Sequence, residues 1–111
     1  MIETIIIDYL AATLSVPVST EHKESDPATF VIVERVGGGI ENHVRTASIA
    51  IQSYAPSMYE AAQLHESVLD AMDGIIALDE IAWVSLNSEY NYTDEETKRP
   101  RYQALYDIEY Y

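Results

Sequence analysis

Residues 101–110 alternate between apolar and polar side chains with a period of two, and Leu105 is the single apolar residue on the polar row. In an extended strand this period sends successive side chains to opposite faces, so one face is apolar and the other is polar. Such a strand needs a second layer over its apolar face. The segment therefore predicts a sheet with one covered face, carrying Tyr102, Ala104, Tyr106, Ile108 and Tyr110.

Three further segments have the composition of strands. Residues 30–36 are rich in β-branched side chains, whereas residues 43–54 and 81–90 show alternating apolar and polar positions. Glycine residues 37–39 interrupt the first segment, so we expect them to form the wide, glycine-rich tip of a hairpin. Residues 81–90 pair with residues 101–110 in a second hairpin. Their period of two groups Ala82, Val84, Leu86 and Tyr90 on one face and Trp83, Ser85, Asn87 and Glu89 on the other.

Two helices are expected beside these strands. Residues 3–15 repeat apolar side chains at every fourth position until Pro17 ends the pattern. The second helix begins at Ser57, because Glu60 three residues later completes a capping box, and it stops at Gly74. The predicted order is α-β-β-α-β-β, which favours an α+β fold with a mainly antiparallel four-stranded sheet and helices packed on one face. The polar residues 18–29 are expected to form a loop.

Length and charge narrow the class of protein further. The 111 residues suit one domain, residues 1–111. The chain has six lysines and arginines and 19 acidic residues, which gives a net charge of −13. This charge argues against wrapping a nucleic acid and against binding an anionic membrane. The chain has no cysteine, which excludes disulfides and thiolate chemistry. Its first residues resemble neither a signal peptide nor a membrane span, so we expect a soluble product.

Catalytic and metal-binding motifs are weak. The three histidines, His22, His43 and His65, fall in separate predicted elements, and residues 37–39 lack the lysine and hydroxyl residue of a phosphate-binding loop. The serines lack a nucleophile-elbow context. We therefore predict no enzyme activity, no metal and no cofactor. A cluster of His43, His65 and acids brought together by folding remains the alternative at this point.

Aromatic residues are concentrated in the second predicted hairpin. Tyrosines there either pack under the helices as core or form a contact surface, since tyrosine is favoured at protein interfaces. Trp83 lies on the face opposite Val84, so it needs cover that a neighbouring subunit can supply. An open sheet also has two edges to protect, and head-to-tail contacts between copies protect both when they close into a ring. These features favour an acidic interaction module that self-associates.

Five segments together resemble the tail terminator (tail-completion) proteins of long-tailed bacteriophages. The resemblance extends in order over nearly the whole chain. It rests on Leu14-Ser-Val-Pro-Val-Ser-Thr-Glu21, Phe30-Val-Ile-Val-Glu-Arg-Val-Gly-Gly-Gly39, Ala50-Ile-Gln-Ser-Tyr-Ala-Pro-Ser57 with Tyr59-Glu-Ala-Ala62, and Pro100-Arg-Tyr-Gln103.

The resemblance implies a virion structural protein of the tail and neck, assembled in the cytoplasm of the bacterial host. Its copies form a ring, a hexamer in this family, at the head-proximal end of the tail tube. The ring stops polymerisation of the tail tube protein and offers a surface to the neck or connector protein in head–tail joining. No catalysis, cofactor or membrane contact is implied. DNA passes through the lumen without specific binding, and acidic walls would keep it from sticking.

Charge and shape matching at the two hairpin tips is the expected mode of assembly. In particular, we expect that changing Arg99 and Arg101 to glutamate leaves folding intact and prevents docking. Two other functions stay open: a head-side connector or head-closure protein, and a small acidic hydrolase or ligand-binding domain, which a pocket with a buried His–carboxylate pair would favour. A DNA-mimicking inhibitor ranks last. The candidate assembly residues are Arg35, Gly37, Gly38, Gly39, Glu41, His43, Arg45, Trp83, Asp94, Glu95, Glu96, Lys98, Arg99 and Arg101.

Overall fold

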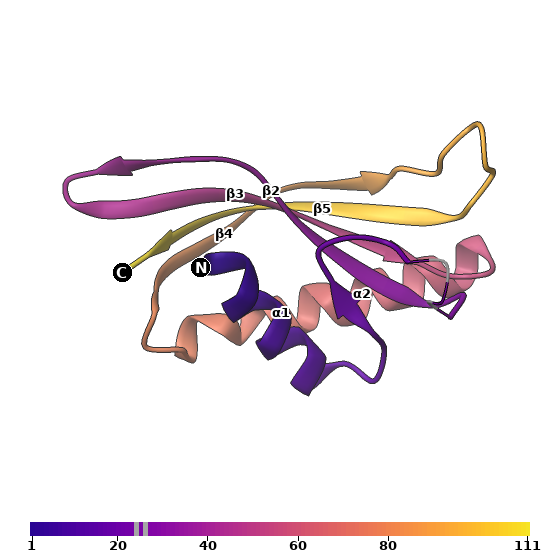
Figure 1. Ribbon diagram of the computed structural model, residues 1–111, viewed down its shortest axis with the longest axis horizontal. Helices are drawn as coiled ribbons and strands as arrows, with labels where there is room; N and C mark the ends of the chain where they lie inside the picture. The colour runs from indigo at the N-terminus through magenta and orange to yellow at the C-terminus, as the bar shows by residue number, and fades with distance from the viewer. Residues whose placement is uncertain (24, 26) are drawn as a thin grey trace.

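A long sheet lies above a layer of two helices in the computed structural model, which describes residues 1–23, 25 and 27–111 (Figure 1). The helices are α1 (Ile2–Thr13) and α2 (Met58–Asp73), followed by the short 3-10 helix η1 (Ile75–Ala77). The strands are β1 (Val18–Ser19), β2 (Phe30–Glu41), β3 (Val44–Tyr54), β4 (Ile81–Asn91) and β5 (Arg101–Tyr110). Neither helix is long and apolar enough to cross a membrane, among the residues described.

The sheet has five strands in the order β1-β2-β3-β5-β4, and β1 runs parallel to β2. The prediction of a four-stranded, mainly antiparallel sheet is therefore wrong. The additional strand falls within residues 18–29, which were expected to be a loop, and it forms because Val18 packs against the main core. The carbonyl of Pro17 also accepts a hydrogen bond from the Val31 amide at 2.9 Å. Two residues are too few to show a period. Glu24 and Asp26 of the same segment lie outside the described residues.

The hairpin between β2 and β3 has a tight tip rather than the wide, glycine-rich one predicted. Residues 37–39 continue β2 and pair with β3, and a register shift between Arg35 and Gly37 leaves Val36 as an extra residue. The turn consists of Asn42 and His43, with φ angles of 51° and 65°. Two successive positive φ angles are typical of the turn that matches the twist of a two-residue hairpin.

Helix α2 begins and ends where its sequence signals are. Ser57 accepts a hydrogen bond from the Glu60 amide at 3.2 Å, and its hydroxyl donates to the Glu60 carboxylate at 3.1 Å. Gly74 closes the helix. The helices pack against one face of the sheet, where Tyr106 and Tyr110 are 5% and 6% exposed. The apolar row of residues 101–110 is thus core, as predicted.

The opposite face of the sheet is also covered near the β4–β5 loop, so the prediction of one covered face is wrong there. Phe30, Ile32 and Tyr54 form a second buried cluster on that face, and Gln103 of the polar row is 7% exposed.

Two bulges interrupt β4, one between Ile81 and Trp83 and one between Leu86 and Ser88. A bulge adds a residue to one strand, so the residues beyond it exchange faces. The second bulge turns Glu89 toward α2 and Tyr90 to the open face. The predicted faces of these two residues are therefore wrong, because strict alternation was assumed along the whole strand.

Candidate assembly surfaces

The predicted assembly residues form two groups at opposite ends of the sheet. In the register of the strands, Arg45 is level with Tyr110 and Tyr54 is level with Arg101. The tip of the β2–β3 hairpin and the β4–β5 loop therefore lie at opposite ends of a molecule whose longest extent is 42 Å (Figure 1). Trp83 lies on β4 toward the hairpin end. Glu41 ends β2, and its side chain lies outside what the structure describes.

At the loop end, two arginines lie on aromatic rings. The Arg101 guanidinium is 4.4 Å from the centre of the Tyr92 ring and donates to the Tyr54 hydroxyl at 2.8 Å, and its Nε donates to the Tyr92 carbonyl. The Arg99 guanidinium is 5.4 Å from the centre of the Phe30 ring. Cation–π contacts of this kind fix a long side chain over a ring. We call this set the arginine–aromatic cluster: His22, Phe30, Tyr54, Tyr92, Arg99 and Arg101.

The β4–β5 loop is also held by Asp94. Its carboxylate accepts a hydrogen bond from the Glu96 amide at 2.9 Å, and its carbonyl accepts one from the Lys98 amide at 2.8 Å. The bond from the Glu96 amide is the main reason that the pKa of Asp94 is below its usual range. Arg101 thus stabilises its own chain, and Glu95, Glu96 and Lys98 are the exposed charges available to a partner. From these contacts we expect reversal of Arg101 to affect folding as well as docking, which revises the expectation above.

At the hairpin end, Arg35 lies over Gly38. A Cβ on Gly38 would meet the Arg35 guanidinium and would be 2.6 Å from the Thr46 carbonyl oxygen. The Arg35 Nε donates to the Gly37 carbonyl at 3.3 Å. Ile40 is 74% exposed beyond the edge of the helices. This end therefore combines positive charge with bare apolar surface.

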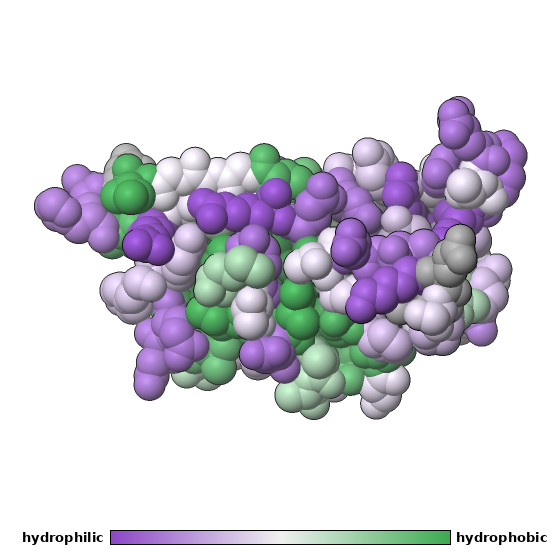
Figure 2. Space-filling view, viewed as in Figure 1, coloured by the Kyte–Doolittle hydropathy of each residue, from purple (hydrophilic) through white to green (hydrophobic). Residues whose placement is uncertain are grey.

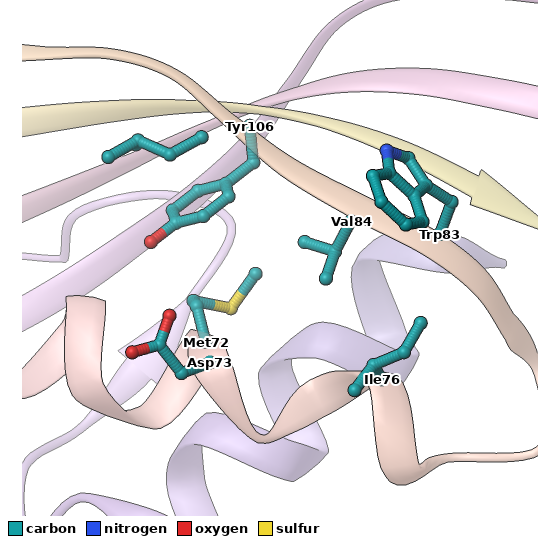
Figure 3. A pocket seen from close by; sticks show the side chains of 7 residues that line it. Met72, Asp73, Ile76, Trp83, Val84 and Tyr106 are labelled. Atoms are coloured by element: carbon teal, nitrogen blue, oxygen red, sulfur yellow. The ribbon is translucent and has the colours of Figure 1, made fainter.

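Trp83 borders a groove between the end of α2 and strand β4 (Figure 3). The cavity measures about 270 Å³, which is smaller than the cavities that hold drug-sized ligands. Burial, Asp73 and Glu89 raise the pKa of Tyr106, on its floor, to about 12. Of the groove residues, the sequence indicated only Trp83. The apolar Ile76, two residues after the glycine that ends the helix, is the sequence signal that could have indicated the others. We call this the Trp83 groove: Met72, Asp73, Ile76, Trp83, Val84, Leu86 and Tyr106.

Both edges of the sheet carry unpaired backbone, over the residues that the structure describes. Strand β4 is an outer strand along its full length. Strand β2 pairs with β1 only at Val31 and Ile32, so residues 33–41 have an open edge too. Long open edges are templates for pairing with another chain unless something covers them.

A buried histidine and a carboxylate meet behind β4. The Nε2 of His65, which is 2% exposed, donates to the Glu89 carboxylate at 2.8 Å, and its ring stacks on Tyr102 with centres 5.1 Å apart. Neither His65 nor Glu89 lines the Trp83 groove. A general base must be within hydrogen-bond reach of a substrate. The enclosed ring therefore favours a structural role, and His43 lies far away in the hairpin turn.

Charge is divided by position along the molecule. Arg45 lies at the hairpin end, and Arg35, at the middle of β2, extends its guanidinium toward that end as far as Gly38. The other basic residues lie at or near the loop end. Figure 2 shows hydrophilic residues over the loop end and apolar residues toward the middle of this face. The two helices contain no lysine or arginine, and their acidic residues are Glu3, Asp8, Glu60, Glu66, Asp70 and Asp73. Among the described residues, no group of three or more histidine and acidic side chains is arranged to hold a metal ion.

No family model matches the chain, and no curated protein matches it.

Proposed function

We propose that this chain is a virion structural protein of a long-tailed bacteriophage, a tail terminator that forms a ring at the head-proximal end of the tail tube. The observation that carries the proposal is the pair of long open edges, β4 and residues 33–41 of β2, on opposite sides of one sheet. The ordered sequence resemblance supplies the family. The edges supply the means of assembly.

The directions of the edge strands suit a ring. Each of the pairs β2–β3, β3–β5 and β5–β4 is antiparallel, so β2 and β4 run in opposite directions. When a second copy is placed beside the first by rotation about an axis along the strands, its β4 meets β2 in the antiparallel sense. Contacts of this head-to-tail kind generate a ring when the rotation closes, and an open filament when it does not. Each copy then covers both of its edges.

The two ends of the sheet form the two rims of such a ring. One rim carries the β4–β5 loop, with Glu95, Glu96 and Lys98 exposed, and the other carries the hairpin tip. The rims are the surfaces that would meet the tail tube protein and the neck protein. Because the basic residues are at or near the ends, the walls between the rims are acidic. An acidic wall repels DNA, which suits a channel that DNA passes through without binding.

Electron microscopy of lysates tests the proposal. The gene for this chain is deleted from the phage genome that carries it, and the wild-type gene on a plasmid serves as the control. Overlong tails beside separate filled heads are expected, because nothing stops the tube. Tails of normal length lying unattached beside heads would move the protein to the head side of the joint. Intact virions would overturn the proposal.

A docking variant refines the test. The variant Lys98→Glu reverses an exposed charge on the loop rim and leaves the arginine–aromatic cluster unchanged. We expect purified, folded Lys98→Glu protein to bind isolated tail tubes more weakly than wild type. Glu66→Lys, an exposed change on α2 away from the rims, is the matched control and should bind as wild type does. Equal binding of wild type and Lys98→Glu would remove Lys98 from the docking surface.

A further inference from the structure

We propose that glycine residues 37–39 of one copy, here called the glycine strip, form the surface against which Trp83 of the next copy in the ring packs. The open edge of β2 then pairs with β4 of that neighbour. This inference rests on the proposed function in so far as it requires self-association. It adds which residues meet, and it explains two features that the isolated chain leaves without a purpose.

The strand register places the two partners at the same height. Gly39 pairs with Thr46, Thr46 pairs with Glu109, and Glu109 pairs with Trp83. Gly39 and Trp83 are thus level with each other on opposite edges of one sheet. A rotation about an axis along the strands does not change height, so Gly39 of one copy comes level with Trp83 of the next. By the same reasoning, Gly37 comes level with Ser85.

Two of the three glycines are not required by the fold of their own chain. No glycine in the described part of the chain has a positive φ. A Cβ on Gly37 or Gly39 would meet its nearest neighbour at 3.8 Å or 3.6 Å, an ordinary van der Waals contact. Glycine inside a strand weakens it and is typical of places where another group approaches closely. The approach here must come from outside the chain.

Trp83 is the complementary feature. Its side chain is 59% exposed on the open face of an edge strand, next to the Trp83 groove (Figure 3). A large aromatic side chain lying across a neighbouring strand covers the backbone that glycine leaves bare, and such pairs stabilise sheet edges. The indole on the bare strip buries apolar surface on both copies.

Charge supports the same arrangement on the helix side of the sheet. Arg35 pairs with Ile49, which is level with Tyr106 and then with Leu86. Leu86 lines the Trp83 groove together with Asp73. In the proposed ring, Arg35 of one copy is therefore level with the groove that holds Asp73 of the next. A basic side chain of the hairpin is then level with the acidic side chain of the groove, and this attraction favours the pairing over contact between like edges.

Disulfide trapping tests the contact, because the chain has no cysteine of its own. The variant Gly37→Cys/Ser85→Cys places one thiol on each edge. Within one chain these positions are three strand spacings apart, about 14 Å, whereas a disulfide requires Cα atoms within about 7 Å. Any disulfide is therefore between copies. The matched control is Gly37→Cys/Glu66→Cys, whose second thiol is exposed on α2.

After mild oxidation of the concentrated protein, we expect a ladder of linked chains and loss of the monomer band for the first variant, with the control remaining monomeric. Adding Trp83→Glu should abolish the ladder, whereas Trp83→Phe should keep it. A ladder equally strong in the control would overturn the contact. The contact would also be overturned if native mass spectrometry showed oligomers of the double-cysteine variant in which no disulfide forms, although a ring with another contact would remain. If the variant formed neither a disulfide nor an oligomer, the edge pairing would be overturned. The deletion phenotype would still decide the terminator role by itself.

Discussion

Glu89 accepts a hydrogen bond from the Nε2 of the buried His65 at 2.8 Å, although strict alternation along β4 would have sent the two side chains to opposite sides of the sheet. The bulge between Leu86 and Ser88 turns the Glu89 side chain toward α2. The bond supplies the partner that a buried imidazole nitrogen needs, because an unsatisfied buried polar group is costly. The pair links the middle of α2 to the edge strand.

Removing the carboxylate should therefore destabilise the protein. We expect Glu89→Ala to lower the free energy of unfolding by about 1–2 kcal/mol, since the His65 Nε2 loses its partner. Glu66→Ala, at an exposed position of α2, is the control and should change the free energy of unfolding by less than about 0.5 kcal/mol. Urea denaturation followed by circular dichroism measures both. Equal effects would show that the His65–Glu89 bond contributes nothing to stability.

The three glycines of the strip should respond differently to the same change. Gly38→Ala places a Cβ 2.6 Å from the Thr46 carbonyl oxygen, and overpacking of this kind costs about 1–3 kcal/mol. Gly37→Ala and Gly39→Ala meet only ordinary contacts and should leave stability unchanged or slightly raised. Thermal unfolding of the three single variants provides the measurement. A Gly39→Ala variant as unstable as Gly38→Ala would mean that the strip serves the fold rather than a neighbour.

Arg101 should matter more to stability than its charge alone suggests. Arg101→Ala loses the bond to the Tyr54 hydroxyl and the contact with the Tyr92 ring, and we expect a loss of about 1–2 kcal/mol. Lys98→Ala, on the same loop but exposed, is the control and should fall within about 0.5 kcal/mol of wild type. Chemical denaturation compares them. If both variants unfold like wild type, the arginine–aromatic cluster does not hold the loop.

Alkaline pH should weaken the fold through Tyr106. Burial and the nearby Asp73 and Glu89 raise the pKa of Tyr106 from 10.0 to about 12. Because the pKa in the folded state is the higher one, the stabilisation is complete below pH 10. It is lost as the pH rises toward 12, where the unfolded chain releases its proton first. Tyr106→Phe should show a smaller loss of stability between these pH values. Unfolding midpoints from pH 9 to 12 decide it, and identical slopes would contradict the assignment.

The sequence determined the elements whose signals are local. Helix α2 begins after Ser57 and stops at Gly74 because the cap and the stop act within one helical turn. Strand β5 covers residues 101–110 as predicted, since its apolar row lies under the helices. Trp83 was expected to be exposed for the same reason, and it is. Local chemistry was sufficient for each of these features.

Tertiary structure alone decided the rest. Strand β1 has two residues and exists because β2 offers it backbone partners far along the sequence. The glycine strip was expected to break β2, but pairing with β3 keeps it extended, because the ladder to β3 outweighs the weak preference of glycine for a strand. The bulges of β4 exchange the faces of Glu89 and Tyr90 because register depends on the partner strand. The amino-acid pattern therefore determined which segments become helix and strand, and the packing of those segments determined which side chains meet.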